Sequence, residues 1–89
     1  MVTFAKAIRR HAECPDHNVE GDTLGAVLSA YFHVHPGARA YVLDERGAIR
    51  RHIAVFINDD LVTDRDLQSD PVAPADRVSV FQALSGGAQ

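Results

Sequence analysis

The pattern of hydrophobic and polar residues divides the chain into strand-like segments around one helix. Residues 2–8 alternate between apolar and polar side chains, which predicts a strand with one buried face. The polar stretch 9–16, which contains Cys14-Pro15, should end that strand in a turn. Residues 17–20 are a weaker candidate for a returning strand.

The helix is predicted to begin after Gly21, where Asp22 or Thr23 can accept a hydrogen bond from the first helical turn. Apolar residues then recur with the spacing i, i+3, i+4, i+7 and i+8, which places them on one helix face. They are Leu24, Val27, Leu28, Tyr31 and Phe32. The helix should end at His35-Pro36-Gly37, because proline cannot continue the hydrogen-bond ladder.

The two-residue period returns downstream. Residues 40–43 run into a turn at Asp44–Gly47 and residues 49–52 lead out of it, which predicts a protruding hairpin or loop. The most hydrophobic run, Ile53–Ile57, predicts a buried strand because it is short, β-branched and bounded by the turn residues 58–60. Leu61-Val62 can complete a hairpin across that turn.

Residues 63–76, rich in aspartate and proline, suit a solvated connection with room for one helical turn. The final predicted strand spans residues 77–84, with Val78 and Val80 facing one side. On the opposite side lie Ser79, Phe81 and Ala83.

One long helix can cover only one face of a sheet, so the order of elements predicts a two-layer α+β domain. Four or five strands would form a mixed sheet wrapped around the main helix, which is the β-grasp, or ubiquitin-like, architecture. The domain should span residues 1–84, and residues 85–89 should form a flexible glycine-containing tail.

Composition and length limit the classes of function that are possible. The 89 residues leave room for one domain, and a formal net charge of −3 disfavours general nucleic-acid binding. A single cysteine excludes an intramolecular disulfide, and no apolar run is long enough for a membrane span. With no secretory signal visible at the N-terminus, we expect a cytoplasmic monomer that binds no membrane.

The C-terminal sequence Ser85-Gly86-Gly87-Ala88-Gln89 carries the candidate chemistry. Two adjacent glycines after a strand leave the backbone unusually unrestricted. The simplest interpretation is a frayed terminus. The alternative is a reactive tail. Two features favour it: the tail follows a sheet that wraps one helix, and the final strand carries an outward Phe81.

In these features the sequence resembles the ThiS/MoaD family of ubiquitin-like sulfur carriers. The resemblance covers the first strand, the helix start Gly21-Asp22-Thr23-Leu24, the segment Ile53–Asn58 and the ending Val78–Gly87. The segment Arg39–Gly47, followed by Arg50-Arg51-His52, is most similar to the branch of the family that serves cysteine biosynthesis.

The resemblance implies a carrier rather than an enzyme, with no catalytic residues and no permanently bound cofactor. An E1-like adenylating enzyme would use ATP to activate the Gly87 carboxylate, and a sulfur donor would convert it to a thiocarboxylate. A sulfhydrylase-like enzyme would accept the sulfur. Leu84, Ser85 and Gly86 would thread into the partner's active site, and Phe81 would either dock the partner or pack in a minor apolar cluster.

One departure from the family pattern concerns processing. The family usually ends at its second glycine, whereas here Ala88-Gln89 follow, so the Gly87 carbonyl is an amide as encoded. Some carriers of this family are trimmed by a JAMM-type metallopeptidase, and we expect the same cleavage between Gly87 and Ala88.

Two other functions remain open. The same activated Gly87 could be attacked by a lysine amine, which would make the chain a protein modifier that forms isopeptide bonds. The chain could also be a β-grasp binding module with an inert tail. An enzyme is disfavoured because the sequence shows no nucleophile–base pair and no clustered acid pair.

Further polar residues have ordinary structural interpretations. His11, Cys14 and His17 could ligate Zn²⁺ together with Glu13, Asp16 or water, but such mixed loop sets are mostly coincidental, and no metal is predicted. His33 and His35 suit the end of a helix. Cys14 is expected to be an ordinary surface or half-buried thiol. The basic pairs Arg9-Arg10 and Arg50-Arg51 are expected to be solvated. The six aspartates between residues 59 and 76 either steer a basic partner or maintain solubility.

Overall fold

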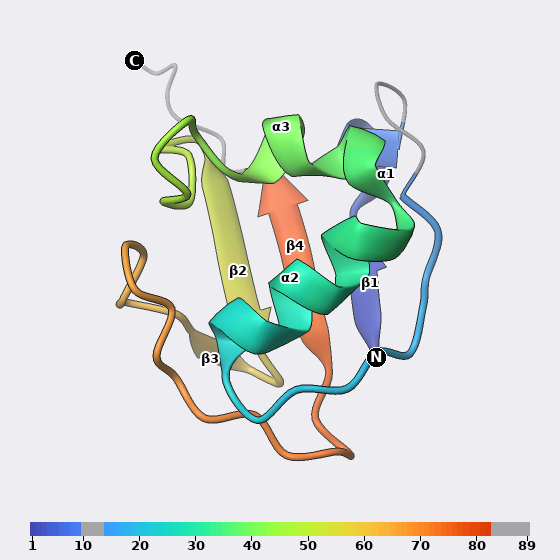
Figure 1. Cartoon of the computed structure of the whole chain (residues 1–89), viewed down its shortest axis with the longest axis vertical. Coiled ribbons are helices and arrows are strands. Elements are labelled where there is room, and N and C mark those ends of the chain that lie inside the picture. The colour runs from blue at the N-terminus through green and yellow to red at the C-terminus, as the bar shows by residue number, and fades with distance from the viewer. Residues whose placement is uncertain (10–13, 83–89) are drawn as a thin grey trace.

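The computed structural model describes residues 1–9 and 14–82. Within them lies one four-stranded sheet with the strand order β1-β4-β2-β3. The strands are β1 (Val2–Phe4), β2 (Ile53–Ile57), β3 (Asp60–Leu61) and β4 (Val78–Gln82). Strand β4 is parallel to β1 and antiparallel to β2. The main helix α2 (Leu24–Val34) crosses one face of this mixed sheet (Figure 1), which confirms the predicted fold class.

Helix α2 begins as its sequence predicts. The Thr23 side chain accepts a hydrogen bond of 3.2 Å from the Ala26 N–H and so caps the first turn. At the other end, the His35 N–H donates to the Tyr31 carbonyl before Pro36 ends the helix. All five residues of the predicted apolar stripe are buried, so this stripe forms the helical side of the core.

The sheet side of the core comes from alternate residues of three strands. Val2 pairs with Val78 in the register of β1 and β4, and Val55 pairs with Val80 in the register of β2 and β4. Each of these four side chains is at most 1% exposed. Val78 and Val80 therefore share one face of β4, as predicted, and this face is buried in the core.

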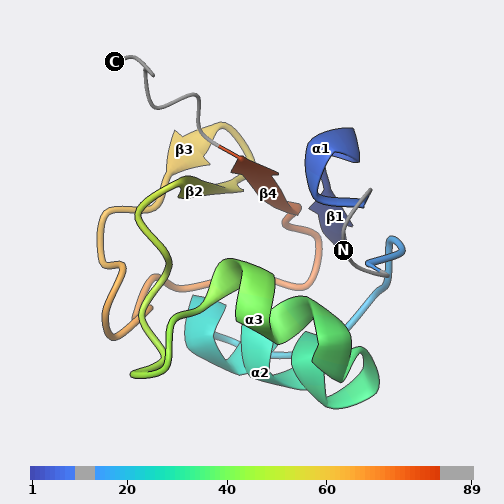
Figure 2. The ribbon, with the colours of Figure 1, turned by 90° about the horizontal axis from the view of Figure 1, so that it is seen from above.

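The predicted first strand is too long. It ends at Phe4, and residues Lys6–Arg9 form a short helix, α1, that lies on the face of the sheet turned away from α2 (Figure 2). The Ile8 side chain reaches the core from this turn and is 1% exposed. The spacing from Phe4 to Ile8 fits both periods, and alanine and lysine favour helix.

The two-residue period predicted for residues 40–43 is wrong, so these residues do not form the strand of a hairpin. The chain instead forms a 3₁₀ turn, η1 (Pro36–Ala38), and a short helix, α3 (Arg39–Val42). In a strand, Ala40 would share a face with Ala38 and Val42, yet Ala40 is exposed while both neighbours are buried. Helical geometry is the arrangement that buries these two residues together.

Of the remaining predictions for individual segments, one is wrong and two are confirmed. Residues 17–20 form no strand, and only the pair Val2–His17 makes a single antiparallel bridge. The turn at Asp44–Gly47 is confirmed, with the Gly47 N–H donating to the Asp44 carbonyl at 3.0 Å and a φ of +88° at Gly47. The hairpin of β2 and β3 is also confirmed, through the pairs Phe56–Leu61 and Ile57–Asp60.

Candidate functional site

The candidate site begins on the outer face of the sheet, which is turned away from α2. Phe81 points outward from β4, pairs in register with Ala54 of β2, and is 46% exposed. Its ring meets that of Phe56 edge to face, with centroids 5.7 Å apart and planes at 88°. Leu61, which is 53% exposed, pairs with Phe56 in register. We call Ala54, Phe56, Leu61 and Phe81 the outer-face patch.

The sequence alternation explains this patch. Val80 and Val55 point into the core, so their neighbours Phe81 and Phe56 must point to the other face. Strand β4 is hydrogen-bonded to a neighbour on each side, which holds Phe81 on a rigid strand rather than on a loop. Sequence reasoning selected Phe81 but missed Phe56, although the same alternation within Ile53–Ile57 was available to find it.

The predicted tail residues lie outside the described part of the chain. They are Leu84, Ser85, Gly86, Gly87, Ala88 and Gln89. Their roles therefore stay predictions. The last described residue of β4, Gln82, pairs with Ile53 at the start of β2. Strand β4 thus points toward the end of the molecule where α3 lies (Figure 1).

A separate polar cluster joins the segment around Pro15 to the end of α2. The ring nitrogens His17 Nδ1 and His35 Nε2 lie 3.0 Å apart, and Tyr31 packs beside His35 with a centroid distance of 4.8 Å. The Tyr31 hydroxyl donates to the Pro15 carbonyl at 2.7 Å. Burial, with a smaller contribution from Cys14, raises the pKa of Tyr31 to about 12. This cluster has a structural role, because it ties the loop to the helix.

The candidate metal set is not brought together among the residues that the structure describes. His11 and Glu13 lie outside the described residues, and His17 faces His35. Cys14 is 3% exposed rather than at the surface, and its burial raises the pKa of the thiol. In the portion of the chain that the structure describes, no group of three or more histidine, cysteine, aspartate or glutamate side chains could hold a metal ion.

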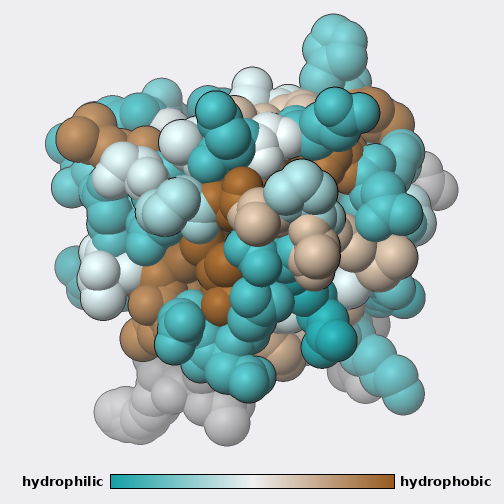
Figure 3. Space-filling view, turned by 90° about the horizontal axis from the view of Figure 1, so that it is seen from below, coloured by the Kyte–Doolittle hydropathy of each residue, from teal (hydrophilic) through white to brown (hydrophobic). Residues whose placement is uncertain are grey.

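A hollow lies at the opposite end of the molecule from the end of β4. It has a volume of about 920 Å³, and its apolar lining includes Val19, Val27 and Val72. Carboxylates, among them Asp22 and Asp76, also line it. Figure 3 shows apolar side chains gathered at the centre of this face, among hydrophilic ones. Val78, the first residue of β4, lines it too, so the hollow lies at the opposite end of this strand from Gln82.

A four-stranded mixed sheet wrapped around one main helix defines a ubiquitin-like β-grasp domain. The ThiS family model matches residues 4–87, and the chain belongs to the ThiS family. Carriers of this family are non-catalytic substrates of activating enzymes, and they bind no cofactor because the partner enzyme uses the ATP.

Solved structures share this fold. CysO from Mycobacterium tuberculosis is 26% identical, with a TM-score of 0.77 over 92% of this chain and 96% of that chain. The Amycolatopsis orientalis BexX/CysO complex contains a chain that is 22% identical, with a TM-score of 0.76 over 98% of this chain and 100% of that chain. SAMP1 from Haloferax volcanii is 24% identical, with a TM-score of 0.75 over 97% and 96%.

No functionally curated protein matches the sequence significantly. Among the helices of the described residues, none has the length and hydrophobicity needed to span a membrane.

Proposed function

We propose that this chain is a sulfur carrier whose Gly87 carboxylate is adenylated and converted to a thiocarboxylate. The observation that carries the proposal is the ThiS-family match, which runs through β4 and extends to Gly87. The exposed Phe81 supports it, because it places an aromatic anchor on the strand that leads into the tail.

The proposed chemistry follows from the state of the terminus. A C-terminal carboxylate has a pKa of about 3.3–3.7, so at neutral pH it is an anion and a poor electrophile. Its oxygen would attack the α-phosphorus of ATP and release pyrophosphate, giving an acyl-adenylate. Sulfide would then attack the Gly87 carbonyl carbon and displace AMP, leaving a thiocarboxylate without any change of oxidation state.

The chain's own contribution is reach and docking. The four residues Leu84–Gly87 span roughly 13 Å when extended, which is long enough to enter a partner's active site from a docked domain. Gly86 and Gly87 carry no Cβ, so the backbone can approach the phosphates of ATP closely. The outer-face patch would bind the partner beside this tail, while the E1-like partner supplies the catalytic groups.

Activation requires that Gly87 be the last residue. With Ala88-Gln89 attached, the Gly87 carbonyl belongs to an amide and has no carboxylate oxygen to adenylate. The proposal therefore includes cleavage between Gly87 and Ala88, and a JAMM-type metallopeptidase is the expected enzyme.

The proposed sulfur acceptor is a sulfhydrylase-like enzyme that makes cysteine or a related metabolite. The similarity to CysO supports this branch, and CysO has been solved in complex with BexX, which supports a partner enzyme for this chain as well. The likeness to SAMP1, which is described as a small archaeal modifier protein, supports the alternative that Gly87 forms isopeptide bonds. A binding module with an inert tail is the third candidate.

One reconstitution separates these three. A chain that ends at Gly87 is incubated with an E1-like enzyme of the source organism, ATP and sulfide, and then analysed by intact mass spectrometry. A carrier exchanges one terminal oxygen for sulfur, whereas a modifier forms lysine conjugates when a protein acceptor is added. An unchanged mass under both conditions would identify the inert module. The chain ending at Gln89 is the control and should not react.

A further inference from the structure

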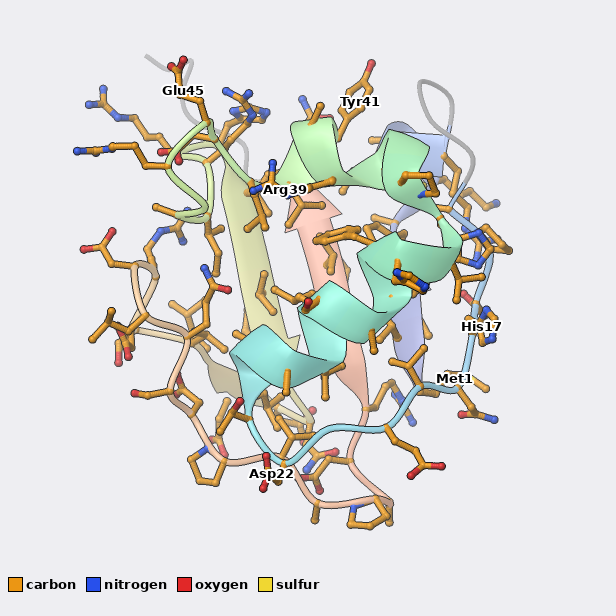
Figure 4. The ribbon with its side chains drawn as sticks, in the orientation of Figure 1. Met1, His17, Asp22, Arg39, Tyr41 and Glu45 are labelled. Atoms are coloured by element: carbon orange, nitrogen blue, oxygen red, sulfur yellow. The ribbon has the colours of Figure 1, made fainter. Side chains whose placement is uncertain are left out.

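A second hollow lies between α2 and the start of α3, on the side of the sheet opposite the outer-face patch. Its volume is about 370 Å³, within the range of about 300–1,000 Å³ that small-molecule sites occupy. We call it the helical hollow, and its polar edge consists of Ser29, His33, Arg39 and Gln68. Figure 4 shows Arg39 at the start of α3, whereas Tyr41 of the same helix points away toward the end of the molecule.

The floor of the helical hollow is apolar and rigid. Leu28 and Phe32 of α2 and Leu43 after α3 line it, and each of these side chains is at most 7% exposed. The Gly25 N–H of α2 donates to the Gln68 carbonyl at 2.9 Å, which fixes the helix against the loop that forms the opposite wall. A ligand would therefore enter a preformed site and lose less entropy on binding than it would in a mobile one.

Arg39 supplies a positive charge that no neighbour neutralises. Its guanidinium makes neither a hydrogen bond nor an ion pair with another residue of segments 1–9 and 14–82, where the one ion pair within 4.0 Å joins Arg9 and Asp16. None of the described residues that line the helical hollow carries a carboxylate. The Arg39 Nη2 lies 4.0 Å from the position that a Cβ on Gly47 would take, so the guanidinium sits beside the 44–47 turn.

Gln68 supplies a buried hydrogen-bond acceptor near this charge. Its side-chain amide donates to the carbonyls of Gly47 and Arg65 at 2.8 and 3.1 Å, which uses both N–H groups. Its Oε1 accepts no hydrogen bond from another described residue, although Gln68 is only 6% exposed. Buried polar atoms normally have a partner, so this oxygen calls for a donor from outside the chain.

The backbone of Gln68 adds to this picture. Its φ is +54°, a left-handed conformation that residues with a Cβ rarely adopt and that persists only where the surroundings impose it. The contacts that impose it are the bond from Gly25 and the bond from the Gln68 N–H to the Asp64 carbonyl at 3.1 Å. Since Gly47 adjoins both the Arg39 guanidinium and the Gln68 amide, the free charge and the free acceptor lie close together.

We propose that the helical hollow binds a small organic carboxylate that carries an apolar ring or chain and an N–H donor. The carboxylate pairs with the Arg39 guanidinium, whose two parallel N–H groups match its two oxygens. The apolar part covers Phe32 and its neighbours on the floor, and the N–H group donates to Gln68 Oε1. Each part of the ligand thus answers one feature of the hollow.

A carboxylate fits the helical hollow better than a phosphate does. The edge carries one arginine, and the whole chain has a net charge of −3, so a group with nearly two negative charges would meet more repulsion than a monoanion. Ser29 and His33 are exposed on α2 and can complete the hydrogen bonds to the carboxylate.

The site does not rest on the proposed sulfur chemistry. The outer-face patch lies on the face of the sheet turned away from α2, whereas the helical hollow is lined by α2 itself. A partner that covers the outer-face patch leaves the helical hollow open. The chain can therefore hold this ligand and a protein partner at the same time.

The test titrates the full chain with N-acetylphenylalanine, which has a carboxylate, a phenyl ring and an amide N–H. NMR of the backbone amides should show saturable shifts at Gly25, Ser29 and Leu43, with a dissociation constant of about 1 mM or lower. The neutral N-acetylphenylalanine amide lacks the carboxylate and should bind about ten-fold more weakly, and hydrocinnamate, which lacks the N–H, about three-fold more weakly.

Arg39→Gln should weaken binding of N-acetylphenylalanine about ten-fold. Arg51→Gln is the matched control, because it makes the same change of charge at an exposed arginine outside the helical hollow, and it should stay within about two-fold of wild type. Since Arg39 is exposed and has no partner among the described residues, its variant should unfold at the wild-type urea midpoint. The neutral probe tests the same contact on the unaltered chain.

Each outcome decides. Carboxylate-dependent, saturable binding that Arg39→Gln weakens and Arg51→Gln does not supports the proposal. Equal affinity for N-acetylphenylalanine and its amide overturns it, and so do shifts that map to the outer-face patch or that fail to saturate below about 20 mM. Equal affinities of Arg39→Gln and Arg51→Gln overturn it as well. A negative result would leave the proposed carrier function unaffected.

Discussion

Phe81 on β4 meets Phe56 on β2 edge to face, with ring centroids 5.7 Å apart, on the face of the sheet turned away from α2. Such a pair contributes about 0.5–1.5 kcal/mol beyond its buried area, so each ring restrains the other. A partner that covers Phe81 would therefore meet a preorganised aromatic surface rather than a mobile side chain.

The first prediction concerns Phe81. Phe81→Ala should weaken binding of the activating enzyme about ten-fold or more, because central aromatic anchors dominate interface energies. It should lower the free energy of unfolding by only about 1 kcal/mol, because a half-exposed aromatic contributes mainly through its one edge-to-face contact. Calorimetric titration and urea unfolding measure the two effects separately.

Leu67 provides the control for Phe81. It is 81% exposed and lies in the loop before Gln68, away from the outer-face patch, so Leu67→Ala should change neither affinity nor stability appreciably. Wild-type affinity in Phe81→Ala would show that the patch is not the docking surface.

A second prediction tests the hydrogen bonds by which Arg65 holds the segment that leads into β2. Arg65→Met keeps the length of the side chain but removes the donors to the carbonyls of Arg50 and Ile53. We expect the free energy of unfolding to fall by about 2–3 kcal/mol, since a charged donor is lost and two part-buried carbonyls lose a partner. Arg77→Met, at an exposed position, should stay within about 0.5 kcal/mol of wild type in the same urea titration.

The third prediction concerns acid. The Asp64 carboxylate accepts hydrogen bonds from the Ser69 hydroxyl and from the backbone N–H groups of Ser69 and Leu67. The Ser69 side chain makes the largest contribution to holding the pKa of Asp64 below its ordinary value. The folded state then binds this proton less tightly than the unfolded state does. Stability from this group is therefore present above the unfolded pKa, about 3.9, and is lost as pH falls through the folded pKa.

Asp64→Asn should accordingly be less stable than wild type at neutral pH and should lose less stability on acidification to about pH 3. Urea midpoints at the two pH values provide the measurement. Asp66→Asn, a change at an exposed neighbour, is the control and should follow the wild-type pH profile. An Asp64→Asn profile parallel to that of wild type would contradict the assignment.

The sequence pattern predicted the elements in which the apolar spacing continues over several turns or in which the apolar residues are deeply buried. The stripe from Leu24 to Phe32 has enough turns to define a helix, and Val78 and Val80 define the inner face of β4. Residues 5–8 and 40–43 are too short, because four residues satisfy the strand and helix periods equally well. Only the tertiary positions of Ile8 and Ala40 distinguish them.

The candidate site could be predicted only in part from the sequence. Phe81 follows from alternation along one strand, but its contact with Phe56 depends on the register between β4 and β2, which no local pattern specifies.

The most direct test of the carrier account is the intact mass of the protein purified from its native cells. The account predicts a species that lacks Ala88-Gln89 and ends at Gly87, with a fraction in which one terminal oxygen is replaced by sulfur. A population in which every molecule retains Ala88-Gln89 would contradict it, because Gly87 would then have no carboxylate to activate.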